Sequence, residues 1–242
     1  MKSIGLLGGM TCESSLVYYK LINEMAREKL GAIHSAESVM VSVDFGRIQP
    51  LMERGEWDEV LSIMIKAARE IENGGADFLL LCTNTIHKFA GAIGREIKIP
   101  ILHIVDATAR EIKKSGLSKV GLLGTRFTME EDFYTVRLEK NYGITSLIPA
   151  AEDRLEIHRI IMDELSRGII NPESRNTYGR IIRDLAGKGA QGIILGCTEI
   201  PLLVTQGQGD IPLFDTTQIH ARAAVEYALA GSGTPDGTKT YS

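Results

Sequence analysis

The sequence predicts an α/β protein made of two similar domains, each with a parallel sheet flanked by helices. Short apolar runs rich in β-forming residues alternate with longer segments of helical period, a pattern typical of parallel strands joined by helices. A strand-and-turn pattern also occurs twice along the chain. The length of 242 residues allows one large domain or two modest ones, at ~100–200 residues per domain.

The expected elements follow from these runs. Strands are expected at residues 4–7, 39–43, 78–81, 120–123, 193–195 and 213–214. Helices are expected at residues 13–30, 59–72, 107–114, 130–140, 155–165 and 177–186, where apolar residues recur at mixed spacings of three and four. Residues 231–242 are rich in glycine and threonine, and we expect them to form a disordered tail.

The repeat indicates how the domains are divided. Residues 75–85 (GADFLLLCTNT) align without gaps with residues 189–199 (GAQGIILGCTE), and residues 4–8 (IGLLG) match residues 120–124 (VGLLG). We interpret this as a duplicated α/β unit, with chance matching of glycine-rich strand ends as the alternative. The expected domains are residues 1–99 with 208–230, and residues 100–207, followed by the tail at 231–242.

Composition excludes several classes of partner. Lys and Arg number 27 and Asp and Glu 31, for a net charge of -4, so we expect no nucleic-acid partner. No run approaches the ~18 apolar residues of a membrane span, and the opening residues do not resemble a signal peptide. We therefore expect a cytoplasmic protein with no membrane partner. The three cysteines have no zinc-site spacing, so they are expected to be thiols and no metal is expected.

The turns after the expected strands are the first candidates for a binding site, because ligands of parallel α/β sheets lie beyond the carboxyl ends of the strands. These turns offer Met10 and Thr11, Thr83 to Thr85, Thr125, and Cys197 with Thr198. Their hydroxyl, amide and backbone N–H groups suit a small carboxylate. Nucleotide binding is the weaker alternative, because the glycine-rich opening lacks the full dinucleotide spacing.

The repeat also assigns different roles to two cysteines. It places Thr83 opposite Cys197, and Cys82 opposite Gly196. A thiol at a strand end beside backbone donors is expected to have a lowered pKa and to serve as a reactive thiolate. This applies to Cys197, whereas Cys82 ends an apolar run and is expected to pack in the core. His87 and His103 are expected to be structural.

Three stretches carry a resemblance to a known family: Ile4 to Met10, Thr83-Asn84-Thr85-Ile86-His87, and Gly196-Cys197-Thr198-Glu199-Ile200. They resemble the signature stretches of the aspartate/glutamate racemase family, in the same order over residues 1 to about 230. The resemblance implies two α/β domains related by a pseudo-two-fold axis, with the active site between them. It also implies a homodimer, no cofactor, and one cysteine on each face of the substrate α-carbon.

The sequence departs from this family at one of the two cysteines. Thr83 stands where the family has cysteine, a combination that resembles the L-aspartate/glutamate-specific racemase sub-branch. A threonine hydroxyl is a far weaker acid than a thiol, so Thr83 is expected to be a poor base. The resemblance further implies that Arg47 binds a substrate carboxylate. The family's second cationic contact falls at or near Ser166, beside Arg167, so its replacement is left open.

The predicted function is cofactor-independent racemisation of aspartate or glutamate, with the L-enantiomer favoured. Thr83 and Cys197 are the predicted catalytic residues, and the predicted substrate-binding residues are Met10, Arg47, Asn84, Thr85, Thr125 and Thr198. Two alternatives are a related cysteine-dependent decarboxylase or isomerase of a small dicarboxylate, and a non-catalytic protein that binds an acidic amino acid.

Overall fold

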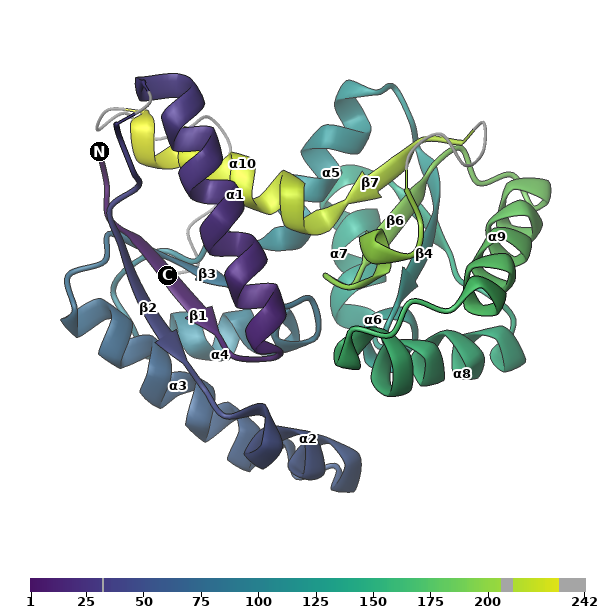
Figure 1. Cartoon of the computed structure of the whole chain (residues 1–242), viewed down its shortest axis with the longest axis horizontal. Coiled ribbons are helices and arrows are strands. Elements are labelled where there is room, and N and C mark those ends of the chain that lie inside the picture. The colour runs from purple at the N-terminus through teal and green to yellow at the C-terminus, as the bar shows by residue number, and fades with distance from the viewer. Residues whose placement is uncertain (32, 206–210, 231–242) are drawn as a thin grey trace. The chain divides into compact units, whose positions relative to one another are not determined.

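The computed structural model describes residues 1–31, 33–205 and 211–230 and divides into two compact units. The first unit comprises Met1–His103 and the chain from His220 onward, and the second comprises Ile104–Ile219. Each unit has its own parallel sheet with helices packed on it (Figure 1). The predicted α/β class with two parallel-sheet domains is thus confirmed.

The sheet of the first unit has the strand order β2-β1-β3. Its central strand, β1 (Ile4–Gly8), pairs in parallel with β2 (Ser38–Ser42) and with β3 (Phe78–Leu81). All five residues of β1 are buried, because a central strand with helices on both faces has no solvent side. This explains why its sequence is continuously apolar or glycine rather than alternating.

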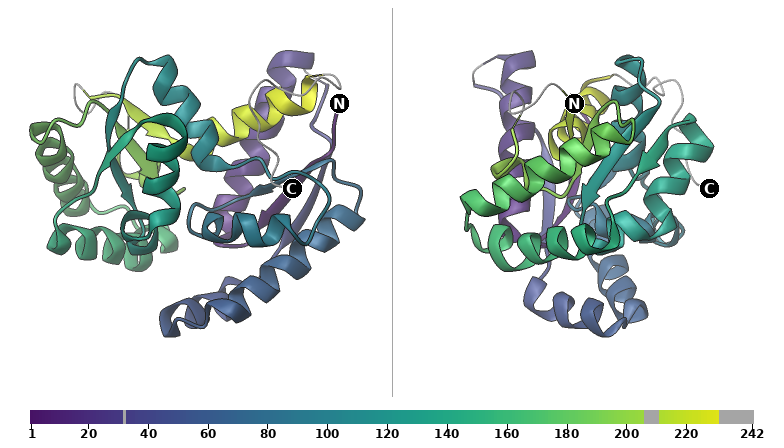
Figure 2. Two further views of the ribbon diagram at one scale, coloured as in Figure 1. Left: turned by 180° about the vertical axis from the view of Figure 1, so that it is seen from behind. Right: turned by 90° about the vertical axis from the view of Figure 1, so that its right-hand side faces the viewer.

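Helices cover both faces of this sheet. One face packs against α3 (Trp57–Asn73) and the short α4 (Ala90–Gly94). The other packs against α1 (Cys12–Leu30) and α10 (Thr216–Leu229), which share one apolar cluster and lie side by side in the views of Figures 1 and 2. A further helix, α2 (Phe45–Arg54), packs on α3.

The second unit has a four-stranded parallel sheet in the order β5-β4-β6-β7. One face packs against α8 and α9, and the other against α5 and α7. The strands are β4 (Lys119–Gly124), β5 (Thr145–Leu147), β6 (Ile193–Gly196) and β7 (Leu213–Asp215). The helices are α5 (Ile104–Lys114), α6 (Arg126–Glu130), α7 (Asp132–Tyr142), α8 (Ala151–Arg159) and α9 (Pro172–Gly187). A π-helical turn, Ile160–Glu164, and a 3₁₀ turn, Leu165–Arg167, follow α8.

The strand register reproduces the internal repeat. Gly5 of β1 pairs with Leu79 of β3, and the aligned residues Gly121 and Ile193 pair in the same way between β4 and β6. Both glycines lie under a helix: an added Cβ would come within 2.5 Å of Ile71 of α3 at Gly5, and within 3.0 Å of Leu185 of α9 at Gly121. The repeat is therefore a repeat of structure as well as of sequence.

The division of the chain differs from the predicted one near residue 208. β7 pairs with β6 and so belongs to the sheet of the second unit, which extends that unit to Ile219. At the other crossing, Leu79 pairs with Ile101, which keeps the chain in the first unit as far as His103. The predicted tail at 231–242 lies outside the described residues. Within the described residues, no helix is both long enough and apolar enough to span a membrane.

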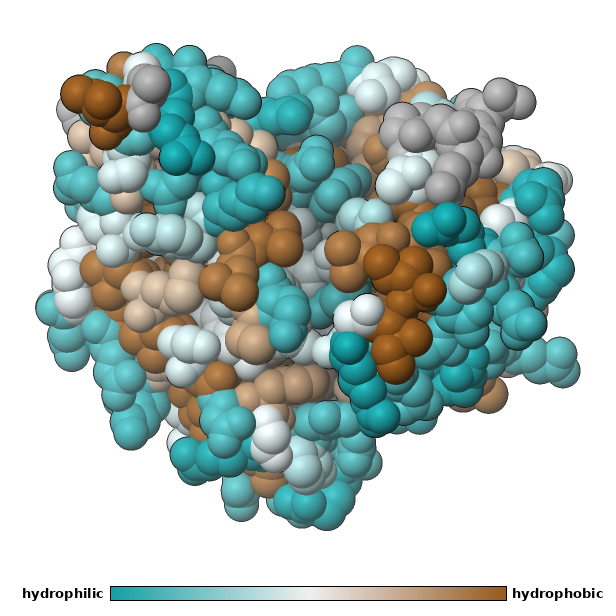
Figure 3. Space-filling view, in the orientation of Figure 1, coloured by the Kyte–Doolittle hydropathy of each residue, from teal (hydrophilic) through white to brown (hydrophobic). Residues whose placement is uncertain are grey.

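The outer surface of α1 carries an unusual distribution of side chains. Its inward face includes the buried Ser14 and Ser15, whereas Leu16 is 67% exposed and Tyr19 49% exposed. Figure 3 colours this face of the molecule by hydropathy and shows brown hydrophobic areas among the teal hydrophilic ones. The first turn of α1 therefore places polar hydroxyls against the sheet, where they contact the strand-end turns described next.

Candidate active site

The turn after β1 is held by the first helical turn of α1. Gly9 has a φ of 95°, which favours glycine, and its amide donates a hydrogen bond to Ser15 Oγ at 2.7 Å. Ser15 Oγ in turn donates to the carbonyl of Thr11 at 3.1 Å. The Thr11 side chain caps α1 by accepting a hydrogen bond from the Ser14 amide at 3.4 Å. Met10, a predicted substrate contact, is buried within this turn.

The turn after β3 lies at the same edge of the sheet. Thr83 is half-buried, and the two residues after it, Asn84 and Thr85, are buried. Ser14 Oγ is within hydrogen-bond distance of the carbonyl oxygens of both Thr11, at 3.0 Å, and Cys82, at 3.3 Å. One hydroxyl therefore joins the two turns, and the predicted residues of the first unit other than Arg47 lie at one edge of its sheet.

Cys82 is a core residue. It has no exposed surface and packs in the apolar cluster between the sheet and the α1 and α10 helices. Burial raises the pKa of its thiol far above the usual range. The prediction that this cysteine packs in the core is confirmed.

The second unit has the equivalent turns at the ends of β4 and β6. Thr125 follows β4 and caps the short α6 helix, with its Oγ1 accepting a hydrogen bond from the Thr128 amide at 3.3 Å. Cys197 and Thr198 follow β6 and are both half-buried. Because Gly124 pairs with Gly196, Thr125 and Cys197 follow directly from paired residues at one edge of this sheet.

Glu199 binds both of its predecessors. The Cys197 thiol donates a hydrogen bond to Glu199 Oε2 at 2.9 Å, and Thr198 Oγ1 donates to the same oxygen at 2.6 Å. Glu199 is itself buried. A thiol thus faces a carboxylate at the strand end that the repeat matches to Thr83.

The expected lowering of the Cys197 pKa is wrong. Burial of the thiol raises its pKa well above the usual range, and the negative charge and hydrogen bond of Glu199 raise it further. Two backbone N–H groups act in the opposite direction but do not compensate. The Cys197 thiol is therefore neutral at rest and donates its hydrogen bond to the Glu199 carboxyl group.

Tyr178 of α9 lies behind this thiol. Its ring packs in the same apolar cluster as Cys197, and its hydroxyl is buried without a hydrogen-bond partner in the described part of the chain. Burial raises the pKa of Tyr178 well above its usual range, with smaller contributions from Cys197 and the carboxylates Glu164 and Glu199. It therefore stays neutral and helps to exclude water from the thiol.

Arg47 lies in a different environment from the strand-end turns. It is exposed on α2, whose first turn is capped by Asp44 through a 3.0 Å hydrogen bond to the Gly46 amide. Arg47 lines a surface cavity of about 350 Å³ together with Lys66 and Glu70. None of the turn residues after β1 or β3 lines this cavity.

The region near Ser166 supplies no buried cation. Ser166 Oγ donates to the Met162 carbonyl at 2.6 Å, closing its own helical turn. The Arg167 side chain is 67% exposed and pairs with Asp163 at 3.8 Å. The nearby Arg159 is bound by Glu156 at 2.8 Å and by Glu164 at 3.0 Å.

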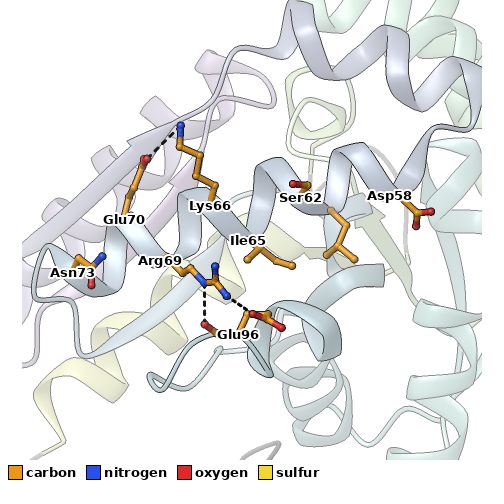
Figure 4. A pocket seen from close by; sticks show the side chains of 9 residues that line it. Asp58, Ser62, Ile65, Lys66, Arg69, Glu70, Asn73 and Glu96 are labelled. Atoms are coloured by element: carbon orange, nitrogen blue, oxygen red, sulfur yellow. Dashed lines mark hydrogen bonds and ion pairs between the residues drawn. The ribbon is translucent and has the colours of Figure 1, made fainter.

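Two larger surface cavities, each of about 530 Å³, also lie away from the strand-end turns. One runs along α3, where Lys66 pairs with Glu70 and Arg69 pairs with Glu96 (Figure 4). The other lies on the second unit between α9 and β7, and includes Arg175 and Arg183. Neither is lined by Thr83 or Cys197. Among the described residues, no cluster of three or more histidine, cysteine or acidic side chains is suited to hold a metal ion.

Sequence reasoning missed three contacts at these turns. They are the thiol-to-carboxylate hydrogen bond of Glu199, the Ser14 hydroxyl that joins two turns, and a hydrogen bond from His87 to the Thr83 carbonyl. The last two have a sequence signal, since Ser14 is three residues after the capping Thr11 and His87 is four residues after Thr83. The orientation of Glu199 has no such signal.

The chain is similar to known proteins in sequence and in structure. The family model described as Asp/Glu/Hydantoin racemase matches residues 7–224. The chain is 24% identical to the broad specificity amino-acid racemase of Bacillus subtilis, over 94% of this chain and 98% of the relative.

Solved structures are more similar still. A crystal structure from Yersinia pestis, described as a candidate Asp/Glu racemase, is 47% identical with a TM-score of 0.89, covering 95% of this chain and all of that one. An aspartate racemase homologue from Pyrococcus horikoshii is 38% identical with a TM-score of 0.81, covering 94% of this chain and 99% of the other.

Proposed function

Because this chain belongs to the Asp/Glu/hydantoin racemase family, we propose that it interconverts the enantiomers of an acidic amino acid, without a cofactor, through Cys197 and Thr83. Family membership confirms the predicted enzyme class, an amino-acid racemase. The proposal adds the acidic substrate, the preference for the L-enantiomer and the two catalytic residues. An aspartate racemase homologue among the similar structures supports the choice of substrate.

The observation that carries the proposal is the pair of matched strand ends. Cys197 follows β6 and Thr83 follows β3, and these strands pair with their central strands in the same register. Cys197 is the half-buried thiol of the chain, since Cys12 is exposed and Cys82 is buried. It also has a carboxylate at hydrogen-bond distance to receive its proton.

We assign the abstraction of the α-proton to Cys197. Its thiol proton first moves to Glu199 Oε2 over the 2.9 Å hydrogen bond, which leaves a thiolate beside a neutral carboxylic acid. The thiolate then takes the α-proton of the L-enantiomer and becomes a thiol again. The hydrogen bond from Thr198 to the same carboxylate oxygen fixes the orientation of Glu199 for this transfer.

We assign the return of a proton on the opposite face to Thr83. A water molecule held by the Thr83 hydroxyl gives a proton to the carbanion and becomes hydroxide. The hydroxide then takes a proton from solvent, and Glu199 releases to solvent the proton it received, which restores the starting carboxylate. Atoms and charge balance over the cycle, and Thr83 itself need not ionise.

Carboxylate binding is assigned to the turn residues. Backbone N–H groups and hydroxyls of Asn84, Thr85, Thr125 and Thr198, with Met10 as an apolar contact, stabilise the α-carboxylate and the charge that develops on it. Arg47 is assigned to the side-chain carboxylate, because a guanidinium grips a carboxylate with two parallel hydrogen bonds.

The test is solvent exchange of the α-hydrogen. The full chain is incubated in D₂O with L- and D-aspartate and L- and D-glutamate, and α-deuterium is followed by ¹H NMR. We expect exchange with at least one acidic amino acid, its loss in Cys197→Ser, and its retention in Cys82→Ser. Binding without exchange would indicate the non-catalytic alternative. Release of CO₂ from a substituted malonate without exchange would indicate the decarboxylase.

A further inference from the structure

Three histidines of the first unit lie buried together behind the Thr83 turn. His87, His103 and His220 are 2%, 7% and 0% exposed. Ring centroids are 4.7 Å apart for His87 and His103 and 5.7 Å for His87 and His220. Burying an imidazole lowers the stability of the fold unless its nitrogens are hydrogen bonded. The hydrogen-bond partners of these rings therefore indicate why they are buried.

The hydrogen bonds determine where two of the ring protons lie. His87 Nδ1 is 2.7 Å from the carbonyl oxygen of Thr83, and a carbonyl only accepts, so Nδ1 carries a proton. By the same reasoning His220 Nε2 donates to the Leu102 carbonyl at 2.7 Å. His220 Nδ1 then accepts from the Tyr18 hydroxyl at 2.8 Å when the ring is neutral.

The carbonyl oxygens of Cys82 and Thr83, two successive residues at the end of β3, therefore both have side-chain hydrogen-bond donors within reach. Ser14 Oγ lies 3.3 Å from the Cys82 carbonyl oxygen, and His87 holds the Thr83 carbonyl. In a planar trans peptide the N–H points opposite to the C=O. The amides of Thr83 and Asn84 consequently point away from Ser14 and from the histidine cluster.

We propose that His87 is a positioning residue for the reaction. It fixes the Thr83–Asn84 peptide so that the Asn84 N–H is aimed at the substrate carboxylate and the Thr83 side chain is held at the end of β3. This inference rests on the proposed function of Thr83.

The rest of the cluster holds the His87 ring in place. His103 is the last residue of the first unit before the chain crosses to the second, and His220 is the first residue after it returns. Tyr18 joins them from α1, with its ring centroid 5.7 Å from that of His220. Two separate segments thus approach the His87 ring, and Tyr18 supports one of them by contacting His220, which limits rotation of the His87 ring.

The variants follow from the position of the ring proton. The amide nitrogen of asparagine replaces Nδ1 of histidine closely, so His87→Asn keeps the donor, whereas His87→Leu fills the space without one. His34, which is exposed on the same unit, provides the control variant His34→Leu.

The first measurement does not depend on activity. In ¹⁵N-histidine-labelled protein, we expect the His87 Nδ1 signal to be that of a protonated nitrogen at neutral pH. The backbone amide signals of Thr83 and Asn84 are expected to shift in His87→Leu and to return towards their wild-type positions in His87→Asn. An unprotonated Nδ1 in neutral His87, or unmoved amide signals in a folded His87→Leu protein, would overturn the inference.

The second measurement is α-hydrogen exchange in D₂O. We expect kcat to fall at least ~10-fold in His87→Leu, because a misaligned donor loses transition-state stabilisation, and to stay within ~3-fold in His87→Asn and His34→Leu. Equal losses in the Asn and Leu variants at equal thermal stability would contradict a positioning role. If the wild type itself exchanges nothing, the proposed function fails, and the amide signals alone decide whether His87 orients the turn.

Discussion

At the scale of single residues, the proposed chemistry depends on a thiol and a carboxyl group whose sulfur and oxygen atoms lie 2.9 Å apart. A low-pKa cysteine needs cationic or N–H neighbours, but the neighbouring Glu199 raises the pKa of the Cys197 thiol. Its raised pKa keeps Cys197 a neutral thiol at rest, so it becomes a base only after Glu199 accepts its proton. In the proposed mechanism Cys197 and Glu199 therefore act together.

Replacing Glu199 with Gln removes the charge and keeps an oxygen acceptor. Because the charge raises the pKa of Cys197, we expect the pKa to fall and alkylation by iodoacetamide to reach its half-maximal rate at a lower pH than in the wild type. We also expect kcat for exchange to fall by ~10²-fold, since the proton acceptor is lost.

Alkylation is best measured in a Cys12→Ser background, because Cys12 is the exposed thiol and Cys82 is buried. In wild-type protein the rate should rise with pH above neutrality, as expected for a thiol whose pKa is raised. A midpoint that stays in place or moves up in Glu199→Gln would show that Glu199 does not control this thiol.

Arg47→Ala should raise KM for the preferred amino acid and change kcat little. A contact to the side-chain carboxylate is made equally in the ground state and the transition state. Lys66→Ala is the matched control, because Lys66 is exposed and lines the same cavity. If KM is unchanged in Arg47→Ala, or changes equally in both variants, the arginine does not bind substrate.

At the scale of elements, the central strands β1 and β4 allow helices to approach closely through glycine. An alanine Cβ at Gly5 would lie 2.5 Å from Ile71 and 2.8 Å from the Phe78 carbonyl oxygen, and a backbone atom in a sheet cannot move aside cheaply. At Gly121 the added Cβ would meet side-chain atoms instead, Ile193 at 2.5 Å and Leu185 at 3.0 Å.

We expect Gly5→Ala to lower the free energy of unfolding by about 1–3 kcal/mol, the usual cost of overpacking. Gly187→Ala is the control, because no atom lies within 4 Å of its added Cβ at the end of α9; it should change stability by no more than about 1 kcal/mol. Urea unfolding monitored by circular dichroism gives both values, and equal effects would contradict the packing assigned to β1.

The elements show which features the sequence can predict. The repeat and the long apolar strands were found because their signals are strong and local. β5 was missed because it has only three residues, of which the first is exposed. α2 was missed because it begins at a single capping aspartate and contains Pro50. The predicted second domain ends at residue 207, before the observed end at Ile219, because β7 is short and its pairing with β6 is not visible in the sequence.

Some features of the candidate site can also be predicted from the sequence, and others cannot. Burial of Cys82 follows from the apolar run that it ends, and the strand-end turns follow from the repeat. The raised pKa of Cys197 depends on how the Glu199 side chain folds back, and the His87 contact depends on packing among three separated segments. Sequence spacing does not determine either orientation.

At the scale of the whole molecule, two units with the same strand register carry different groups at their matched strand ends. A thiol stands at the end of β6 and a hydroxyl at the end of β3. The equilibrium constant between enantiomers is one, so net racemisation must have equal kcat/KM in both directions. In the proposed mechanism, the chemical difference between the thiol and the hydroxyl therefore appears in solvent exchange that retains the configuration of the substrate.

The most direct test of the account is the comparison of α-hydrogen exchange with inversion for each enantiomer of aspartate or glutamate in D₂O. We predict that the L-enantiomer exchanges with retention at least ~10-fold faster than it inverts, because Cys197 both removes and returns its proton, and that the D-enantiomer exchanges no faster than it inverts. A folded Thr83→Cys variant should gain rapid exchange of the D-enantiomer. Comparable exchange of both enantiomers by the wild type, or no gain in Thr83→Cys, would contradict the assignment of Thr83 and Cys197.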